Sequence, residues 1–159
     1  MLSRKNIIVA AVLLSAVGLI DAGYLAYSRF SHSELSCSFL DGCNLVAASP
    51  YSVLFGIVPL AYLGFLFYAL MLVLALVLLS RNTPLVRQTA LLFSAAGVLS
   101  SAYFTYLQIF VIKAFCVYCL ISAALSVLIF SLMLKLYFLH KSSVGTNEVD
   151  GDTHEPLIT

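Results

Sequence analysis

Four long runs of apolar residues divide the chain, with shorter polar segments between them. They cover about residues 7–27, 53–79, 88–110 and 116–139. Each run reaches the roughly 20 residues that a helix needs to cross the hydrocarbon core of a bilayer. Lipid offers no hydrogen-bond partner to the backbone, so each run is expected to be helical. The pattern predicts an all-α fold, an integral membrane four-helix bundle.

Polar residues mark the remaining parts of the chain. Residues 1–141 are expected to form one transmembrane domain, and residues 142–159 a polar, acidic and disordered cytoplasmic tail. Arg4 and Lys5 precede the first apolar run, as basic residues do in a signal peptide. Because the run is longer than the roughly 7–15 apolar residues of a signal peptide, it is interpreted as a retained helix.

The composition is typical of a chain surrounded by lipid. Hydrophobic residues make up 62% of the chain and charged residues 9%, whereas soluble domains have about 25% charged residues. The net charge is +1, and the sequence has no basic stripe, glycine-rich phosphate loop or zinc-finger spacing. Membrane lipid is therefore an expected contact, and nucleic acid is not.

Basic residues are distributed unequally between the two ends of the predicted bundle. One end holds Arg4, Lys5, Arg81, Arg87, Lys135 and Lys141, and the other holds Arg29 and Lys113. Cytoplasmic loops carry the excess of Lys and Arg, so both termini are expected in the cytoplasm and the protein in the inner (plasma) membrane. The segment from about residue 28 to residue 52, and the turn near Lys113, then face the periplasm or exterior.

All four cysteines fall in the segments that are predicted to face outward. Cys37 and Cys43 lie in the outer loop, and Cys116 and Cys119 form a C-x-x-C motif where the fourth apolar run begins. Disulfides persist in the outward compartment. The four cysteines are therefore the candidate catalytic residues.

A helix start favours redox chemistry at the C-x-x-C motif, because unpaired N–H groups and the helix dipole stabilise a thiolate there. Residues three apart on a regular helix have Cβ atoms about 5–6 Å apart, whereas a disulfide requires about 3.8 Å. Cys116 is therefore expected at or before the first turn, and Cys119 about one turn deeper, within reach of a lipid-soluble oxidant. The turn at Asp41-Gly42 predicts that the outer pair lies on a flexible loop.

Several motifs together resemble the vitamin K epoxide reductase family. They are the loop C-x5-C, Ser49-Pro50-Tyr51, Phe55-Gly56-Ile57 with Pro59 and Gly64, and Phe115-Cys116-x-x-Cys119. The resemblance covers most of the chain and implies a bundle that holds a quinone (ubiquinone or menaquinone) under an outward redox loop. Electrons would pass from a thioredoxin-like partner to the loop cysteines, then to the C-x-x-C pair and to quinone, which drives disulfide formation.

The same resemblance implies roles for individual residues. Cys37 would meet the partner, Cys43 would bond transiently to Cys116, and Cys119 would face the quinone. Ser49 matches a loop Ser or Thr close to the reacting pair, and is a candidate for both catalysis and quinone binding.

A lid over the mouth of the bundle is a further expectation. Asn44 can cap a short half-helix, and Pro50 can end it. The half-helix would then cover the bundle between the outer loop and the second span.

Two positions depart from the vertebrate enzymes of the family. Leu60 and Ala123 stand where those enzymes carry an Asn and a Tyr. The missing polar groups argue against epoxide reduction and favour a bacterial-type protein in which quinone accepts the electrons. Many bacterial members also carry a fifth helix and a fused thioredoxin domain. Neither is found in these residues, so the expected partner is a separate extracytoplasmic thioredoxin-like protein.

Other interpretations of the cysteines and of the fold remain open. Two inert structural disulfides would use the same residues, although C-x-x-C at a helix start is a poor structural staple. A four-cysteine zinc site prefers two short spacings and only one is present, so no metal is expected. A convergent quinone-linked disulfide generator would carry its two cysteine pairs in the reverse order. The alternative function is a non-enzymatic tetraspan scaffold or small transporter, and a transporter should show broken helices with charged groups at the midplane.

Asp21 is the acidic residue within the apolar runs. An intramembrane acid is by default a functional hypothesis, here the binding or protonation of quinone. Its alternatives are a group that reaches the membrane interface and an ion pair with Lys113.

Overall fold

The computed structural model describes residues 3–31, 46, 49, 52–54, 58–81 and 83–149. Its helices are α1 (Arg4–Phe30), α3 (Leu60–Ser80), α4 (Pro84–Tyr106), which continues as the π-helix η2 (Leu107–Ile112), and α5 (Val117–Val149). Two short strands, β1 (Val53–Leu54) and β2 (Val58–Pro59), pair antiparallel.

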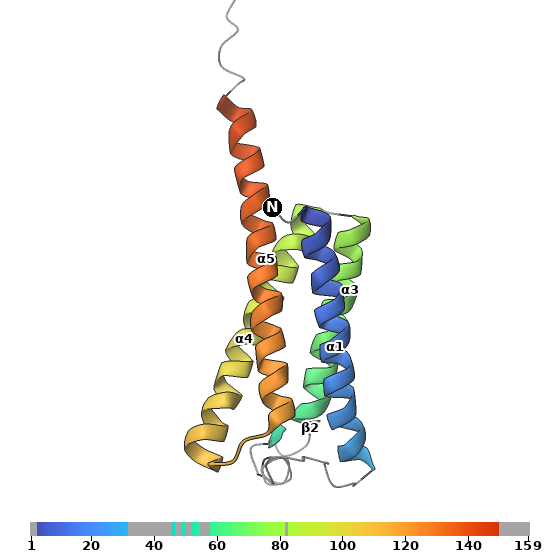
Figure 1. The fold of residues 1–159 in the computed structure, drawn as a ribbon, viewed down its shortest axis with the longest axis vertical. Coiled ribbons are helices and arrows are strands. Elements are labelled where there is room, and N and C mark those ends of the chain that lie inside the picture. The colour runs from blue at the N-terminus through green and yellow to red at the C-terminus, as the bar shows by residue number, and fades with distance from the viewer. Residues whose placement is uncertain are drawn as a thin grey trace, which may run out of the picture.

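The four long helices run alternately up and down in one bundle (Figure 1). α1 packs against α3 and α5, and α4 packs against α5 and α3. Among the described residues, four segments are long and apolar enough to cross a membrane: Arg4–Phe30, Leu60–Ser80, Pro84–Ile112 and Val117–Leu139. The predicted all-α, membrane-spanning four-helix bundle is confirmed. The predicted lid half-helix falls largely outside the described residues.

The second span begins later than the sequence pattern predicted. Residues 53–59 were expected to be helical, but Val53 pairs with Pro59 and Leu54 with Val58 in a small hairpin, and α3 begins at Leu60. Proline restricts the residue before it to extended conformations and has no N–H to donate. Pro59 therefore fits a strand end directly before a helix start. Hydropathy alone cannot distinguish such an apolar hairpin from a helix.

The fourth helix ends later than expected. α5 continues to Val149 and extends past the ends of the other helices (Figure 1), so residues 142–149 are helical rather than disordered. Extending an existing helix requires no new nucleus, and each added residue gains one hydrogen bond. Polar residues can therefore continue α5 beyond residue 141, although they cannot extend the membrane span.

Small residues allow α1 and α3 to approach closely. The buried face of α1 includes Ala11, Ser15, Gly18, Ala22 and Ala26. Small side chains replace bulky ones at helix contacts in membranes, where close packing drives association. A Cβ atom added at Gly18 would overlap the ring of Tyr68 on α3.

We expect Gly18→Ala to destabilise the bundle by about 1–3 kcal/mol, the usual cost of overpacking a core. The added methyl group would displace Tyr68, which is 1% exposed. Gly64→Ala is the matched control, since its Cβ would meet only the Ala22 Cβ at 3.8 Å, an ordinary contact. Thermal unfolding in detergent measures both variants. Equal midpoints for the two would contradict the close packing at Gly18.

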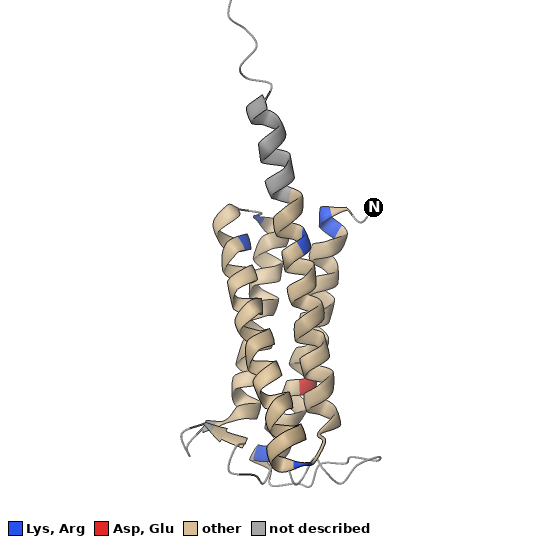
Figure 2. Cartoon of the chain, turned by 90° about the vertical axis from the view of Figure 1, so that its left-hand side faces the viewer, with Lys and Arg blue, Asp and Glu red and all other residues tan. Residues whose placement is uncertain are grey.

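Basic residues gather at the end of the bundle that carries the N-terminus, and few lie at the other end (Figure 2). Arg4 and Lys5 begin α1, and Arg81 and Arg87 flank the α3–α4 connection. Lys113 lies at the opposite end, between η2 and α5. The folded bundle therefore keeps the charge asymmetry of the sequence along its long axis.

Candidate functional site

The C-x-x-C motif lies at the start of α5, with Cys116 directly before the first helical residue, Val117. The Cys116 carbonyl accepts the Leu120 N–H at 3.1 Å, the first hydrogen bond of the helix. The Cys116 Sγ accepts the Cys119 backbone N–H at 3.4 Å. A side-chain acceptor for this N–H is the usual task of a Ser, Thr, Asp or Asn at a helix N-cap. The sulfur of Cys116 therefore occupies the position of a capping oxygen.

Both cysteines of the motif are free thiols in different surroundings. Cys116 is 2% exposed, and Cys119 is half-buried one turn into the helix. A hydrogen bond from the Cys119 side chain lowers the pKa of Cys116, and the backbone N–H groups of Cys119 and Tyr118 lower it further. Burial and the charge of Asp21 act in the opposite direction but do not cancel these hydrogen bonds. The surroundings of Cys116 therefore stabilise its ionised form, the thiolate.

We expect Cys116 to react with iodoacetamide at lower pH than an ordinary cysteine, whose pKa is about 8.5. Only the thiolate is nucleophilic. A lowered pKa therefore shifts the half-maximal rate below pH 8.5, and the rate still falls at more acidic pH. Cys119→Ala removes the side-chain hydrogen bond and should move the half-maximal rate to higher pH. Peptide-resolved mass spectrometry over a pH series measures both. A wild-type midpoint at or above 8.5 would contradict the capped geometry.

Gln108 in η2 accepts hydrogen bonds from the backbone of the segment that connects η2 to α5. This residue was not among those predicted from the sequence. Gln108 is 3% exposed, and its Oε1 accepts the Cys116 backbone N–H at 3.0 Å. Its backbone carbonyl accepts the N–H groups of Lys113 and Ala114. Lys113 has a left-handed conformation, with φ 55° and ψ 33°, which ends the preceding helix. The signal in the sequence was an amide side chain within an apolar run, because such a group must find a partner in the membrane.

Asp21 lies on α1 close enough to act electrostatically on Cys116. Its Oδ2 is buried and has no hydrogen-bond partner among the described residues, so this oxygen does not form the ion pair with Lys113 that was one alternative for its role. Nearby, the rings of Tyr24 on α1 and Tyr118 on α5 lie 5.2 Å apart between centroids. The two helices therefore bring the acidic residue and the C-x-x-C motif to the same end of the bundle.

Tyr68 and Ser122 add hydroxyl groups one turn deeper than Cys119. The Tyr68 hydroxyl donates to the Ser122 carbonyl at 2.6 Å and lies 3.0 Å from the Ser122 Oγ. Sequence reasoning missed both residues, since a tyrosine in an apolar run resembles an interface residue. Leu60 and Ala123, the two apolar residues at positions that were expected to be polar for epoxide reduction, are both half-buried.

These groups fit a quinone, whose carbonyl oxygens need hydrogen-bond donors. The Asp21 Oδ2 has no hydrogen-bond partner among the described residues, and the Ser122 hydroxyl lies one turn below Cys119. Ser15 is also buried, and its Oγ likewise has no partner among the described residues. Buried polar atoms without a partner carry a free-energy cost, which a polar ligand would relieve. This cost applies to Asp21, whereas Tyr68 and Ser122 already bond to each other. Asp21, Tyr68 and Ser122 are described residues that could hold the quinone oxygens.

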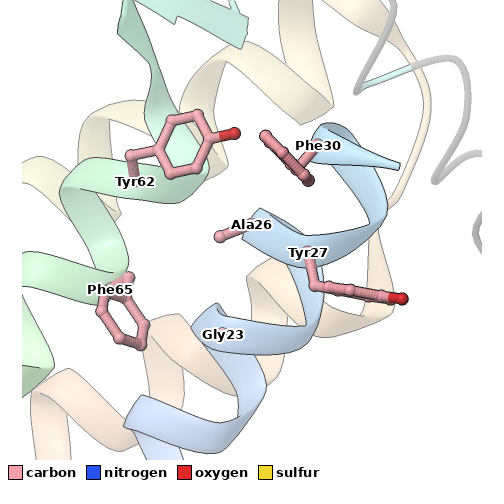
Figure 3. A pocket seen from close by; sticks show the side chains of 6 residues that line it. All are labelled: Gly23, Ala26, Tyr27, Phe30, Tyr62 and Phe65. Atoms are coloured by element: carbon pink, nitrogen blue, oxygen red, sulfur yellow. The ribbon is translucent and has the colours of Figure 1, made fainter. Parts of the chain in front are cut away.

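A separate groove lies between α1 and α3 and has a volume of about 290 Å³. Figure 3 shows Tyr62 of α3 pointing toward Phe30 of α1, and the side chain of Ala26 on the side of α1 that faces α3. Its lining consists of Gly23, Ala26, Tyr27, Phe30, Tyr62 and Phe65. The lining contains neither a cysteine nor Asp21, so this groove is not the thiol site.

Ser49 is half-buried in a short turn. Its Oγ and its N–H both donate to the Val46 carbonyl, at 2.8 and 3.2 Å. Its carbonyl accepts the Ser52 hydroxyl at 2.8 Å. These contacts give Ser49 a structural role in the turn, and its predicted part in catalysis stays a prediction. Cys37 and Cys43 lie outside the described residues, so the distance from the loop pair to Cys116 is not defined.

Comparison with known proteins agrees with the arrangement of these motifs. The model of the vitamin K epoxide reductase family matches residues 9–134. A thiol-disulfide oxidoreductase from Arabidopsis thaliana, LTO1, is 34% identical over 125 residues, which are 74% of this chain and 33% of that protein. The chain thus spans about a third of the length of this relative. The helix bundle, the C-x-x-C motif at the start of α5 and the match over four helices place the chain in the vitamin K epoxide reductase family.

Proposed function

We propose that this protein is a membrane thiol–quinone oxidoreductase that generates disulfides. The observation that carries the proposal is the placement of Cys116 at the N-cap of a membrane-spanning helix, with Cys119 one turn deeper. In this arrangement Cys116 would exchange disulfides with the loop cysteines at the membrane surface. Cys119 would react with the lipid-soluble quinone. Membership of the family and the thiol-disulfide oxidoreductase named above support it.

The proposed relay moves two electrons and two protons per cycle. A thioredoxin-like dithiol protein reduces the Cys37–Cys43 disulfide and leaves with a disulfide of its own. The Cys43 thiolate then attacks Cys116 in the Cys116–Cys119 disulfide and releases Cys119 as a thiolate. Cys37 resolves this mixed disulfide by attacking Cys43, which restores the loop disulfide and leaves Cys116 and Cys119 reduced. A quinone, when bound, accepts two electrons and two protons from this dithiol.

The chain's own groups prepare the deeper end of the site for that acceptor. Asp21, Tyr68 and Ser122 would hold and protonate its oxygens, and Ser49 would act near the loop pair. The N-cap position of Cys116 stabilises its thiolate, which is released when Cys37 resolves the mixed disulfide. Leu60 and Ala123 offer no hydrogen-bond donor to an epoxide oxygen, and losing one such donor typically costs about 10²–10³ in rate. We therefore propose quinone, rather than an epoxide, as the substrate.

We further propose that both termini are cytoplasmic and that the C-x-x-C end faces the periplasm or exterior, in an inner (plasma) membrane. The excess of basic residues at the N-terminal end of the bundle supports this orientation (Figure 2).

A matched pair of single-cysteine variants should report this orientation. Ser31 and Ser80 are both exposed, at the ends of α1 and α3, and Ser→Cys changes neither charge nor size appreciably. In a background that lacks the native cysteines, Ser31→Cys should react with a membrane-impermeant thiol reagent in intact cells. Ser80→Cys should react only after the membrane is broken. The reverse pattern would contradict an outward site.

Steady-state turnover tests the proposed function. The purified protein in lipid nanodiscs receives a reduced thioredoxin-like donor together with either ubiquinone or menaquinone, and separately with vitamin K epoxide. We expect quinone reduction that depends on the donor, and epoxide reduction slower by at least about 10². A scaffold or transporter would give neither reaction. Comparable epoxide turnover would contradict the substrate assignment.

A further inference from the structure

Gln108 completes an N-cap arrangement that the C-x-x-C motif cannot complete by itself. In the common capping box, the N-cap side chain accepts the N3 backbone N–H, and a Glu or Gln at N3 accepts the N-cap N–H in return. Here Cys116 is the N-cap residue and Cys119 is at N3. The first half of the box is present, because the Cys116 Sγ accepts the Cys119 N–H at 3.4 Å.

The second half of the box comes from a different helix. A thiol at N3 is a poor acceptor for the N-cap N–H, and the Gln108 Oε1 accepts the Cys116 N–H at 3.0 Å instead. Gln108 is eight residues earlier in the chain, in η2, and both residues are buried. A backbone N–H buried at this depth requires a partner.

Gln108 also fixes the segment between the two helices. Its backbone carbonyl accepts the N–H groups of Lys113 and Ala114, and its side chain accepts that of Cys116. The two carbonyl oxygens of one residue thus bind three N–H groups of the connection. These bonds fix the backbone from which the Cys116 side chain projects, and from that position its Sγ accepts the Cys119 N–H.

We propose that Gln108 is the positioning residue of the C-x-x-C site: through the backbone of Cys116 it holds that sulfur at the N-cap, where the thiolate is stabilised. Among the residues that the structure describes, the titratable groups around Cys116 are Cys119 and Tyr118 on α5 and Asp21 on α1, with Tyr24 on α1 beside Tyr118. The charged residue of the connection, Lys113, has an exposed side chain. None of these groups is changed when Gln108 is replaced. The inference deepens the proposed function, but its test measures thiol chemistry rather than quinone turnover.

Two substitutions remove the hydrogen bond in different ways. Gln108→Met keeps the length of the side chain without the acceptor, and Gln108→Asn keeps the amide but is one methylene too short to reach. Gln88→Met is the control, because Gln88 is exposed on α4 at the opposite end of the bundle. The readouts are the pH midpoint of Cys116 alkylation by iodoacetamide and the hydrogen exchange of residues 113–117. Helical content by circular dichroism reports folding.

We expect both Gln108 variants to retain their helices and to alkylate Cys116 about tenfold more slowly at neutral pH, which corresponds to a midpoint about one pH unit higher. Hydrogen exchange of the connection should become faster, and Gln88→Met should match the wild type. A folded Gln108 variant with a wild-type midpoint would overturn the proposal. Loss of folding in both variants would also overturn it, since Gln108 would then be a structural requirement. Failure of quinone turnover in the wild type would instead contradict the proposed function and leave these thiol measurements unaffected.

Discussion

Replacing Cys119 with serine should abolish quinone reduction from every thiol donor, by at least about 10³-fold, the scale of losing an essential nucleophile. Cys119 lies one turn deeper than Cys116, and without its thiol no disulfide can close within the C-x-x-C pair. The electrons of Cys116 then have no two-electron route to the acceptor. Turnover of purified Cys119→Ser with dithiothreitol and with a protein donor measures the effect.

The fold of Cys119→Ser should survive, which makes the result informative. The hydrogen bond from residue 119 to the Cys116 Sγ comes from the backbone N–H, so the substitution leaves it in place. Serine also fits the volume of a half-buried cysteine. A folded Cys119→Ser protein that still reduced quinone would show that another group delivers the electrons.

Replacing either loop cysteine should lower turnover with a protein donor much more than turnover with a small thiol. We expect Cys37→Ser and Cys43→Ser to lose turnover with a thioredoxin-like donor by about 10³-fold or more, while dithiothreitol still drives much of the wild-type rate. A small thiol can reach the C-x-x-C disulfide directly, whereas a folded partner needs the loop as a relay. The ratio of the two rates in each variant is the measurement.

The two loop variants also control for each other. Cys37→Ser leaves Cys43 able to form a mixed disulfide with Cys116. That disulfide should accumulate, because Cys37 is absent and only the back reaction of Cys119 can open it. Cys43→Ser should form no such species. An equal fall of both donor rates would contradict the relay and would point to a structural role for the loop disulfide.

The helices were predictable because a membrane imposes one solution on a long apolar run: a helix that satisfies its own backbone. The same constraint does not set where a run starts. Val53–Leu54 and Val58–Pro59 are as apolar as the span that follows, yet they form two paired strands directly before α3. At the other end, the polar residues 142–149 continue α5, since composition is a weak guide to where an established helix stops.

The site was predictable only where its chemistry is local. The place of Cys116 directly before a helix followed from the spacing of the motif and the reach of a disulfide. Gln108 and Tyr68 did not follow, because their partners are groups that the fold brings together from other helices or connections. Asp21 was recognised as unusual from its position in an apolar run. The ion pair with Lys113 was one alternative for its role, and its Oδ2 has no hydrogen-bond partner among the described residues.

A single turnover in the absence of any donor tests the transfer of electrons from the C-x-x-C pair to quinone most directly. The protein carrying Cys37→Ser and Cys43→Ser is fully reduced, freed of reductant and mixed with excess quinone. Direct transfer predicts one hydroquinone per protein chain and a Cys116–Cys119 disulfide, detected by mass spectrometry, that forms at the same rate. Unchanged quinone, or hydroquinone that forms while Cys116 and Cys119 remain reduced, would contradict it.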